Sequence, residues 1–113
     1  MLMDVVADLT PARYMNPGAG VTTSMMLNVI RHDLDEDFNA FELCEALRRR
    51  YPAEYRDELV KNASHDDPAK RTVAAIGARL NHAPFDRTIR ALGHEWTLNA
   101  RGTSSRVALF GKL

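Results

Sequence analysis

The chain has 113 residues, of which 45% are hydrophobic and 27% charged, and its formal net charge at pH 7 is zero. This composition excludes wholesale disorder, and the length fits one domain that buries its own core. The single cysteine excludes an intramolecular disulfide, and no apolar run approaches the roughly 20 residues of a membrane span. The opening MLMDVVADLT carries acids where a secretory signal carries bases, so we expect a cytoplasmic protein with no membrane partner.

Charge is divided unevenly along the chain. Residues 1–69 contain thirteen acidic and seven basic residues, whereas residues 70–113 contain two acidic and eight basic residues. A basic segment joined to an acidic one is typical of chains that bind a polyanion. Uneven scatter of surface charge explains the split equally well, so the split alone decides nothing.

Apolar periodicity predicts three helices in the first half of the chain. The first covers residues 22–33, follows the breaker cluster NPGAG and begins at Thr22 or Thr23. The acidic run DLDEDFN is interpreted as a turn. The second helix covers residues 39–50, where Asn39 and Glu42 have the spacing of a capping box. Pro52 suits the first turn of a third helix over residues 53–62.

Two further helices are predicted in the second half. Asp67 followed by Pro68 indicates the start of a helix over residues 69–81. Phe85, Ile89 and Leu92, at positions i, i+4 and i+7, predict a fifth helix over residues 84–93. About three residues join these two helices, which is the usual connection in a helix-turn-helix.

After Glu95 the apolar period changes from about 3.6 to 2. Trp96 and Leu98 alternate with polar residues, Val107 and Leu109 do so again, and RGTSS between them has turn chemistry. The sequence therefore predicts a β-hairpin over residues 95–110. Trp96 is expected to pack against the helices, with base stacking as the alternative.

The segments TVAAIGARL, RTIRALG and EWTLNARGTSSRVALF together resemble the winged-helix family of DNA-binding domains. The resemblance implies an α+β, mainly helical fold in which a helix-turn-helix precedes a β-hairpin wing, over residues 39–113. Residues 1–38 are then an N-terminal arm and helix. In that family the first helix of the pair supports, the second enters the major groove, and the wing touches the backbone or the minor groove.

We expect the helix over residues 84–93 to read bases, because arginine pairs bidentately with guanine. Cations and hydroxyls at the hairpin tip suit phosphates, as do the two basic residues at the start of the preceding helix. The candidate DNA-binding residues are Lys70, Arg71, Arg87, Thr88, Arg90, His94, Arg101, Thr103, Ser104 and Arg106. In the alternative placement the preceding helix enters the groove, through Arg71, Ala75, Ala78, Arg79 and His82.

The sequence thus predicts a sequence-specific double-stranded DNA-binding protein, such as a small transcription regulator or a replication or partition factor. The alternative is a winged-helix module that docks on an acidic protein partner. Scattered histidines, Cys44 on an apolar helix side, and the lack of catalytic or phosphate-loop motifs predict no metal, no cofactor, no small-molecule substrate and no enzyme activity. The apolar stripe of the first helix either forms a homodimer or covers its own core; its residues are Met25, Met26, Val29 and Ile30.

Overall fold

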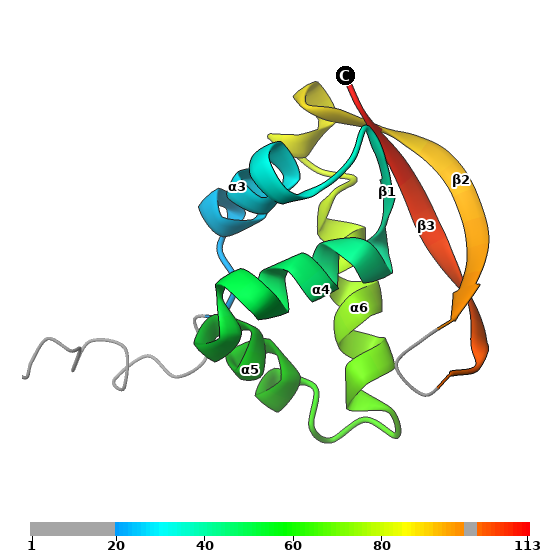
Figure 1. The fold of residues 1–113 in the computed structure, drawn as a ribbon. Helices are drawn as coiled ribbons and strands as arrows, with labels where there is room; N and C mark the ends of the chain where they lie inside the picture. The colour runs from blue at the N-terminus through cyan, green and yellow to red at the C-terminus, as the bar shows by residue number, and fades with distance from the viewer. Residues whose placement is uncertain (1–19, 99–101) are drawn as a thin grey trace, which may run out of the picture.

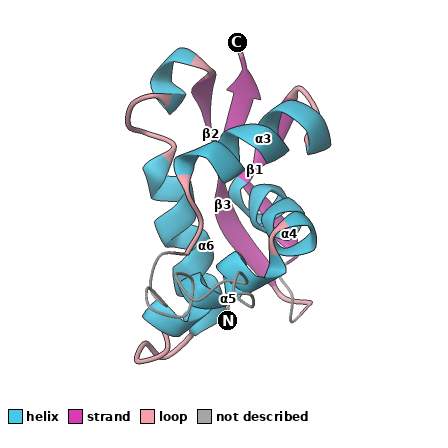
Figure 2. Ribbon diagram, turned by 90° about the vertical axis from the view of Figure 1, so that its left-hand side faces the viewer, coloured by secondary structure: helices cyan, strands magenta, loops and turns pink. Residues whose placement is uncertain are grey.

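The computed structural model describes residues 20–98 and 102–113, and over them the protein is α+β and mainly helical. Helices gather on one side of a small antiparallel sheet (Figure 1), and Figure 2, viewed from the helical side, shows the sheet behind them. The predicted N-terminal arm and Arg101 lie outside the described residues. The elements are α3 (Thr23–Asp33), β1 (Asp37–Asn39), α4 (Ala40–Arg50), α5 (Pro52–Lys61), α6 (Pro68–Arg79), the 3₁₀ turn η1 (Phe85–Arg87), β2 (Ile89–Leu98) and β3 (Ser104–Lys112).

The four helices begin where local signals predict. The Thr22 hydroxyl accepts a hydrogen bond from the Met25 backbone, which caps α3. Asn39 and Glu42 form the predicted capping box of α4, each side chain accepting from the other's backbone N–H. Because such caps satisfy the free N–H groups of a first turn using residues within four positions, they can be recognised without the tertiary structure.

The apolar stripe of α3 belongs to the protein's own core. Met26, Val29 and Ile30 are all 2% exposed or less and pack with residues of α4, α6 and both long strands. The buried residues of the stripe are therefore not available to a second copy. Of the two interpretations, the structure supports the one in which the stripe covers the protein's own core. One core also joins α3 to residues of α4, α5 and α6 and to Phe85, Ile89 and Phe110.

The sheet has the order β1-β3-β2, with both pairings antiparallel. β1 was predicted as part of an acidic turn, which is wrong: Phe38 is opposite Phe110, and their rings stack with centroids 5.9 Å apart. Three residues are too few to show a period of 2. Only a partner strand some 70 positions away makes this segment a strand.

The predicted helix over residues 84–93 is wrong, and with it the helix-turn-helix that it completed. Phe85–Arg87 forms a short 3₁₀ turn, and the chain is extended from Ile89 onward. Phe85 and Ile89 are buried as predicted, but Leu92 is the extra residue of a β-bulge and is 39% exposed. Strand β3 continues to Lys112 and supplies backbone partners as far as Ile89. Non-local pairing has overridden an apolar spacing that also fits a helix.

The hairpin was predicted correctly in kind, but both strands extend beyond residues 95–110. Trp96 does not anchor it: the indole is 71% exposed. The outer halves of β2 and β3 contain no buried residue, although α6 runs beside the hairpin (Figure 1). No helix among the described residues is both long and apolar enough to cross a membrane.

Candidate nucleic-acid interface

A groove of about 360 Å³ lies between α6, the first turn of α4 and the β2–β3 hairpin. Its lining is mainly apolar and includes some polar side chains. Figure 1 shows α6 beside the hairpin, with the first turn of α6 at the same end of the molecule as the far end of the hairpin. The apolar lining residues include Phe41, Val73, Ala74, Gly77, Ala78, Val107 and Ala108, and the polar lining residues are Asp67, Lys70, Asn81, His94, Ser105 and Arg106.

Helix α6 turns one side to the core and a flat side to solvent. Thr72, Ile76 and Gly77 are buried. A Cβ at Gly77 would lie 3.1 Å from the Cβ of Ala40, so this glycine permits the close crossing of α6 over α4. The solvent side carries two cations in the first turn and then only small side chains, which leaves the helix backbone accessible. The exposed residues of this side are Lys70, Arg71, Ala74, Ala75 and Ala78.

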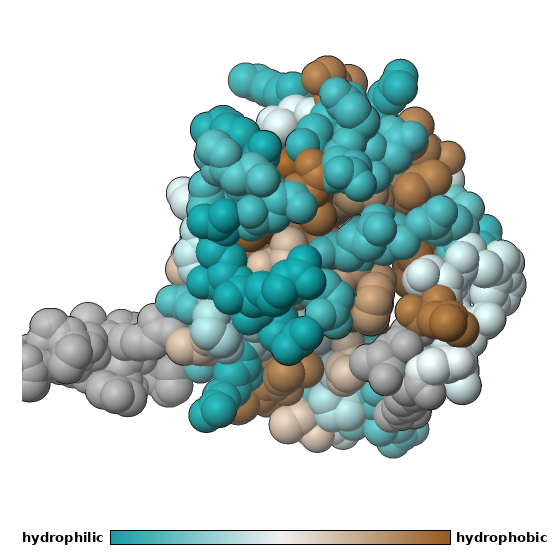
Figure 3. All heavy atoms as spheres, in the orientation of Figure 1, coloured by the Kyte–Doolittle hydropathy of each residue, from teal (hydrophilic) through white to brown (hydrophobic). Residues whose placement is uncertain are grey.

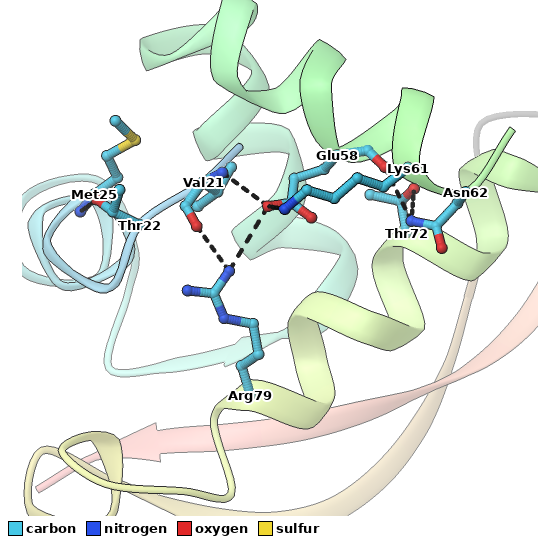
Figure 4. Close-up of polar contacts among 8 residues, drawn as sticks. All are labelled: Val21, Thr22, Met25, Glu58, Lys61, Asn62, Thr72 and Arg79. Atoms are coloured by element: carbon cyan, nitrogen blue, oxygen red, sulfur yellow. Dashed lines mark hydrogen bonds and ion pairs between the residues drawn. The ribbon is translucent and has the colours of Figure 1, made fainter. Parts of the chain in front are cut away.

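Arg79 does not share that solvent side. Its guanidinium donates a 2.8 Å hydrogen bond to the Val21 carbonyl and lies 3.9 Å from the carboxylate of Glu58 (Figure 4). Glu58 is buried and also accepts from the Val21 backbone N–H at 2.8 Å, with the Lys61 ammonium 3.6 Å away. The alternative placement therefore loses Arg79 as a DNA contact, because its charge is engaged within the fold.

The groove brings together three of the predicted DNA-binding residues, Lys70 of α6 and His94 and Arg106 of the hairpin. No carboxylate among the described residues forms an ion pair with Lys70, Arg71 or Arg106, so these charges face solvent. The only acid in β2 and β3 is Glu95, which accepts a 2.6 Å hydrogen bond from the Asn39 amide. Asp67 also lines the groove, and it caps α6 by accepting from the Lys70 backbone N–H.

Three other predicted residues lie at the opposite end of the molecule. Arg87 is exposed in η1, Thr88 is half-buried after it, and Arg90 is exposed at the start of β2. The Thr88 carbonyl accepts from the backbone of Leu113, which ties this segment to the end of the chain. Because they do not lie on a helix, the predicted base-reading role of these three residues loses its geometric basis. η1 lies well away from the far end of the hairpin in Figure 1.

The hydroxyls of Thr103 and Ser104 lie in the exposed far part of the hairpin, as predicted. The sequence analysis did not predict Ala74 as a groove residue. It named Ala78 as an outward-facing residue only in the alternative placement, in which the helix over residues 69–81 enters the DNA groove. The available signal was the set of small residues at positions 74, 75 and 78, which follow a helical period next to Lys70 and Arg71.

No group of three or more His, Cys, Asp or Glu side chains that could hold a metal ion occurs within residues 20–98 and 102–113. The buried Cys44 lies in the core, where desolvation raises the pKa of its thiol to about 12. Comparison of the chain with protein-family models found no match, and searches of curated proteins and of solved structures found no similar protein.

Proposed function

We propose that this protein binds double-stranded DNA as a winged-helix domain, with α6 in the major groove and the β2–β3 hairpin as its wing. α6 is the last full helix before the hairpin, which is the place of the recognition helix in the family that the sequence resembles. Two preceding helices, α4 and α5, pack against α6 and hold it in place. The recognition role thus moves from the segment 84–93 to α6.

The observation that carries this proposal is the solvent side of α6. Lys70 and Arg71 lie in its first turn, where the positive end of the helix dipole also favours anions. Three exposed alanines follow, and small side chains allow a helix to approach the floor of a groove about 12 Å wide. Arg106 lies across the groove from Lys70, as expected of a wing cation that holds phosphate.

Within this proposal the two cations of α6 have different roles. Arg71 belongs to the row that continues through Ala75 and Ala78, the middle of the exposed side, so it is the candidate for pairing with guanine. Lys70 lies on the groove side with Arg106, so both are candidates for phosphate contacts. Such a binder suits a cytoplasmic transcription regulator or a replication or partition factor. A homodimer would double the contacts across half-sites ~34 Å apart.

The test is a salt titration of binding to random-sequence duplex DNA, followed by fluorescence anisotropy. Each phosphate neutralised by a cation releases counterions, so the logarithm of affinity should fall linearly with the logarithm of salt. With contacts from Lys70, Arg71 and Arg106, we expect a slope of about −2 to −3. If this protein does not bind duplex DNA at low salt, the proposed function is wrong.

A second candidate function is supported by the walls of the groove, which are mainly apolar. A helix or strand of an acidic partner protein could place apolar side chains there and carboxylates against Lys70 and Arg106. This candidate predicts no duplex binding at low salt in the same titration, so one experiment separates the two functions. The cationic, alanine-rich side of α6 favours DNA.

A further inference from the structure

The exposed apolar side chains of the structure concentrate on one strand. Of the five large hydrophobic residues exposed within the described residues, three lie on β2: Leu92, Trp96 and Leu98. Trp96 and Leu98 are 71% and 62% exposed. Figure 3 shows hydrophobic atoms reaching the surface along the hairpin side of the molecule. The exposed indole of Trp96 does not contribute to the core, which makes it a candidate for contact with a ligand.

The register of the hairpin fixes the side on which Trp96 lies. Phe110 of β3 is buried in the core, and alternate residues of a strand share a side, so Arg106 is on the same side as Phe110. Trp96 is directly opposite Arg106, and directly opposed residues also share a side. The bulge at Leu92 adds its residue to β2 alone, nearer the core, and does not alter this pairing. Trp96 therefore continues the core-facing side of the sheet, which is the side toward α6.

This side of the hairpin is basic. Arg106 is the cross-strand neighbour of Trp96, and His94 lies two residues before it on the same strand. The one acid of the hairpin, Glu95, lies on the opposite side and accepts from Asn39. An aromatic ring that lies next to a guanidinium and on the opposite side of the sheet from Glu95 matches a nucleotide, whose base presents a flat face and whose phosphate carries a negative charge.

We propose that Trp96 stacks on an unpaired base, and that the protein prefers a junction between duplex and single-stranded nucleic acid to a continuous duplex. This inference rests on the proposed function, because α6 holds the duplex part. In a continuous duplex each base is covered by its neighbours, so stacking requires opening a step, at a cost. An unpaired base next to the duplex presents its face without that cost. Arg106 then contacts the phosphate of the stacked nucleotide.

Trp96 is the only tryptophan of the chain, so its fluorescence reports this contact alone. The experiment compares a blunt duplex with the same duplex carrying a mixed-sequence single-stranded extension at one end, in both polarities. We expect the extended duplex to quench Trp96 emission and to bind about tenfold more tightly than the blunt duplex, as stacking of one base allows. Trp96→Leu should remove this preference while retaining binding to the blunt duplex.

Trp96→Phe is the matched control, because it keeps an aromatic ring and should keep most of the preference. Both variants should fold as the wild type does, checked by circular dichroism, because the indole is mostly exposed. Equal affinity for blunt and extended duplexes without quenching would overturn stacking and leave duplex binding intact. Absence of binding to either nucleic acid would overturn the proposed function as well, so the two failures are distinguishable.

Discussion

The guanidinium of Arg79 in α6 donates a 2.8 Å hydrogen bond to the backbone carbonyl of Val21, which lies 58 positions earlier in the chain. The buried carboxylate of Glu58 completes the connection, since it accepts from the Val21 N–H and lies 3.9 Å from Arg79 (Figure 4). Three elements meet here: the entry to α3, the middle of α5 and the end of α6. These contacts hold α6 against the helical side of the fold, and they leave the side that carries Lys70 and Arg71 exposed.

Arg79→Ala should lower the free energy of unfolding by about 1–2 kcal/mol, because the Val21 carbonyl and Glu58 lose a charged donor. Urea denaturation followed by circular dichroism measures the change. Arg71→Ala, on the solvent side of the same helix, is the matched control and should change stability by about 0.5 kcal/mol or less. Equal losses in the two variants would mean that the Arg79 contacts contribute nothing.

Gly77→Val should destabilise the fold by about 1–3 kcal/mol, since even the first carbon of the new side chain lies 3.1 Å from the Ala40 Cβ. Because α6 must then move away from α4, affinity for DNA should fall as well. Ala75→Val introduces the same side chain on the exposed side of α6 and serves as the control for stability alone, because Ala75 belongs to the proposed DNA-contacting side. If both valine variants unfold at the same denaturant concentration, the close crossing of the two helices is not required.

Lys70→Ala and Arg106→Ala should each weaken binding to specific and random duplex alike, and each should flatten the salt slope by about one unit. Arg71→Ala should instead cost about 1–3 kcal/mol on a specific site and relax the preference at one base pair. Arg87→Ala is the control: it removes the same charge at the other end of the molecule and should leave the slope unchanged. A larger effect from Arg87 than from Lys70 would move the interface away from α6.

Cys44 should be inert to thiol reagents in the folded protein. Burial raises the pKa of its thiol from the ordinary 9.0 to about 12, against a smaller lowering by the hydrogen bond with Tyr55, so almost no thiolate forms near pH 8. Because the folded state holds the thiol neutral, its contribution to stability is complete below pH 9 and is lost as pH rises from there toward 12. The labelling rate at pH 8 should equal the rate of unfolding, and rapid labelling of folded protein would contradict this assignment.

The ion pair between Asp33 and Arg50 should make stability fall in acid. The Nε and one Nη of Arg50 each donate to a carboxylate oxygen of Asp33 at 2.7 Å, and this hydrogen bonding holds the pKa of Asp33 below its ordinary 3.8. A lowered carboxyl pKa contributes stability above pH 3.8, and this contribution disappears as pH falls through the folded value. Melting temperatures of the wild type and of Asp33→Asn should therefore differ near neutral pH and converge at low pH. A constant difference across the titration would show that the pair has no effect on stability.

Some of the fold could be predicted because its signals are local. Thr22, Asn39 and Asp67 each cap a helix through a contact within three or four residues, so short windows of sequence contain the cause and the effect together. The stripes of apolar residues in α3 and α4 likewise identify buried sides, because a helix repeats every 3.6 residues wherever it lies. Lys70, His94 and Arg106 were identified as candidate contacts from charge and position alone.

Only the tertiary structure decided which helix has an exposed side next to the hairpin. The segment from Ile89 to Leu92 fits both a helix and a strand, and the long pairing with β3 selects the strand. The exposure of Trp96 has the same origin, since it depends on which segments the fold places beside the outer half of the hairpin. A helix contains its own hydrogen-bond partners, whereas a strand receives them from another segment, so sequence alone determined the helix starts and the arrangement of the whole chain determined β1, β2 and the groove.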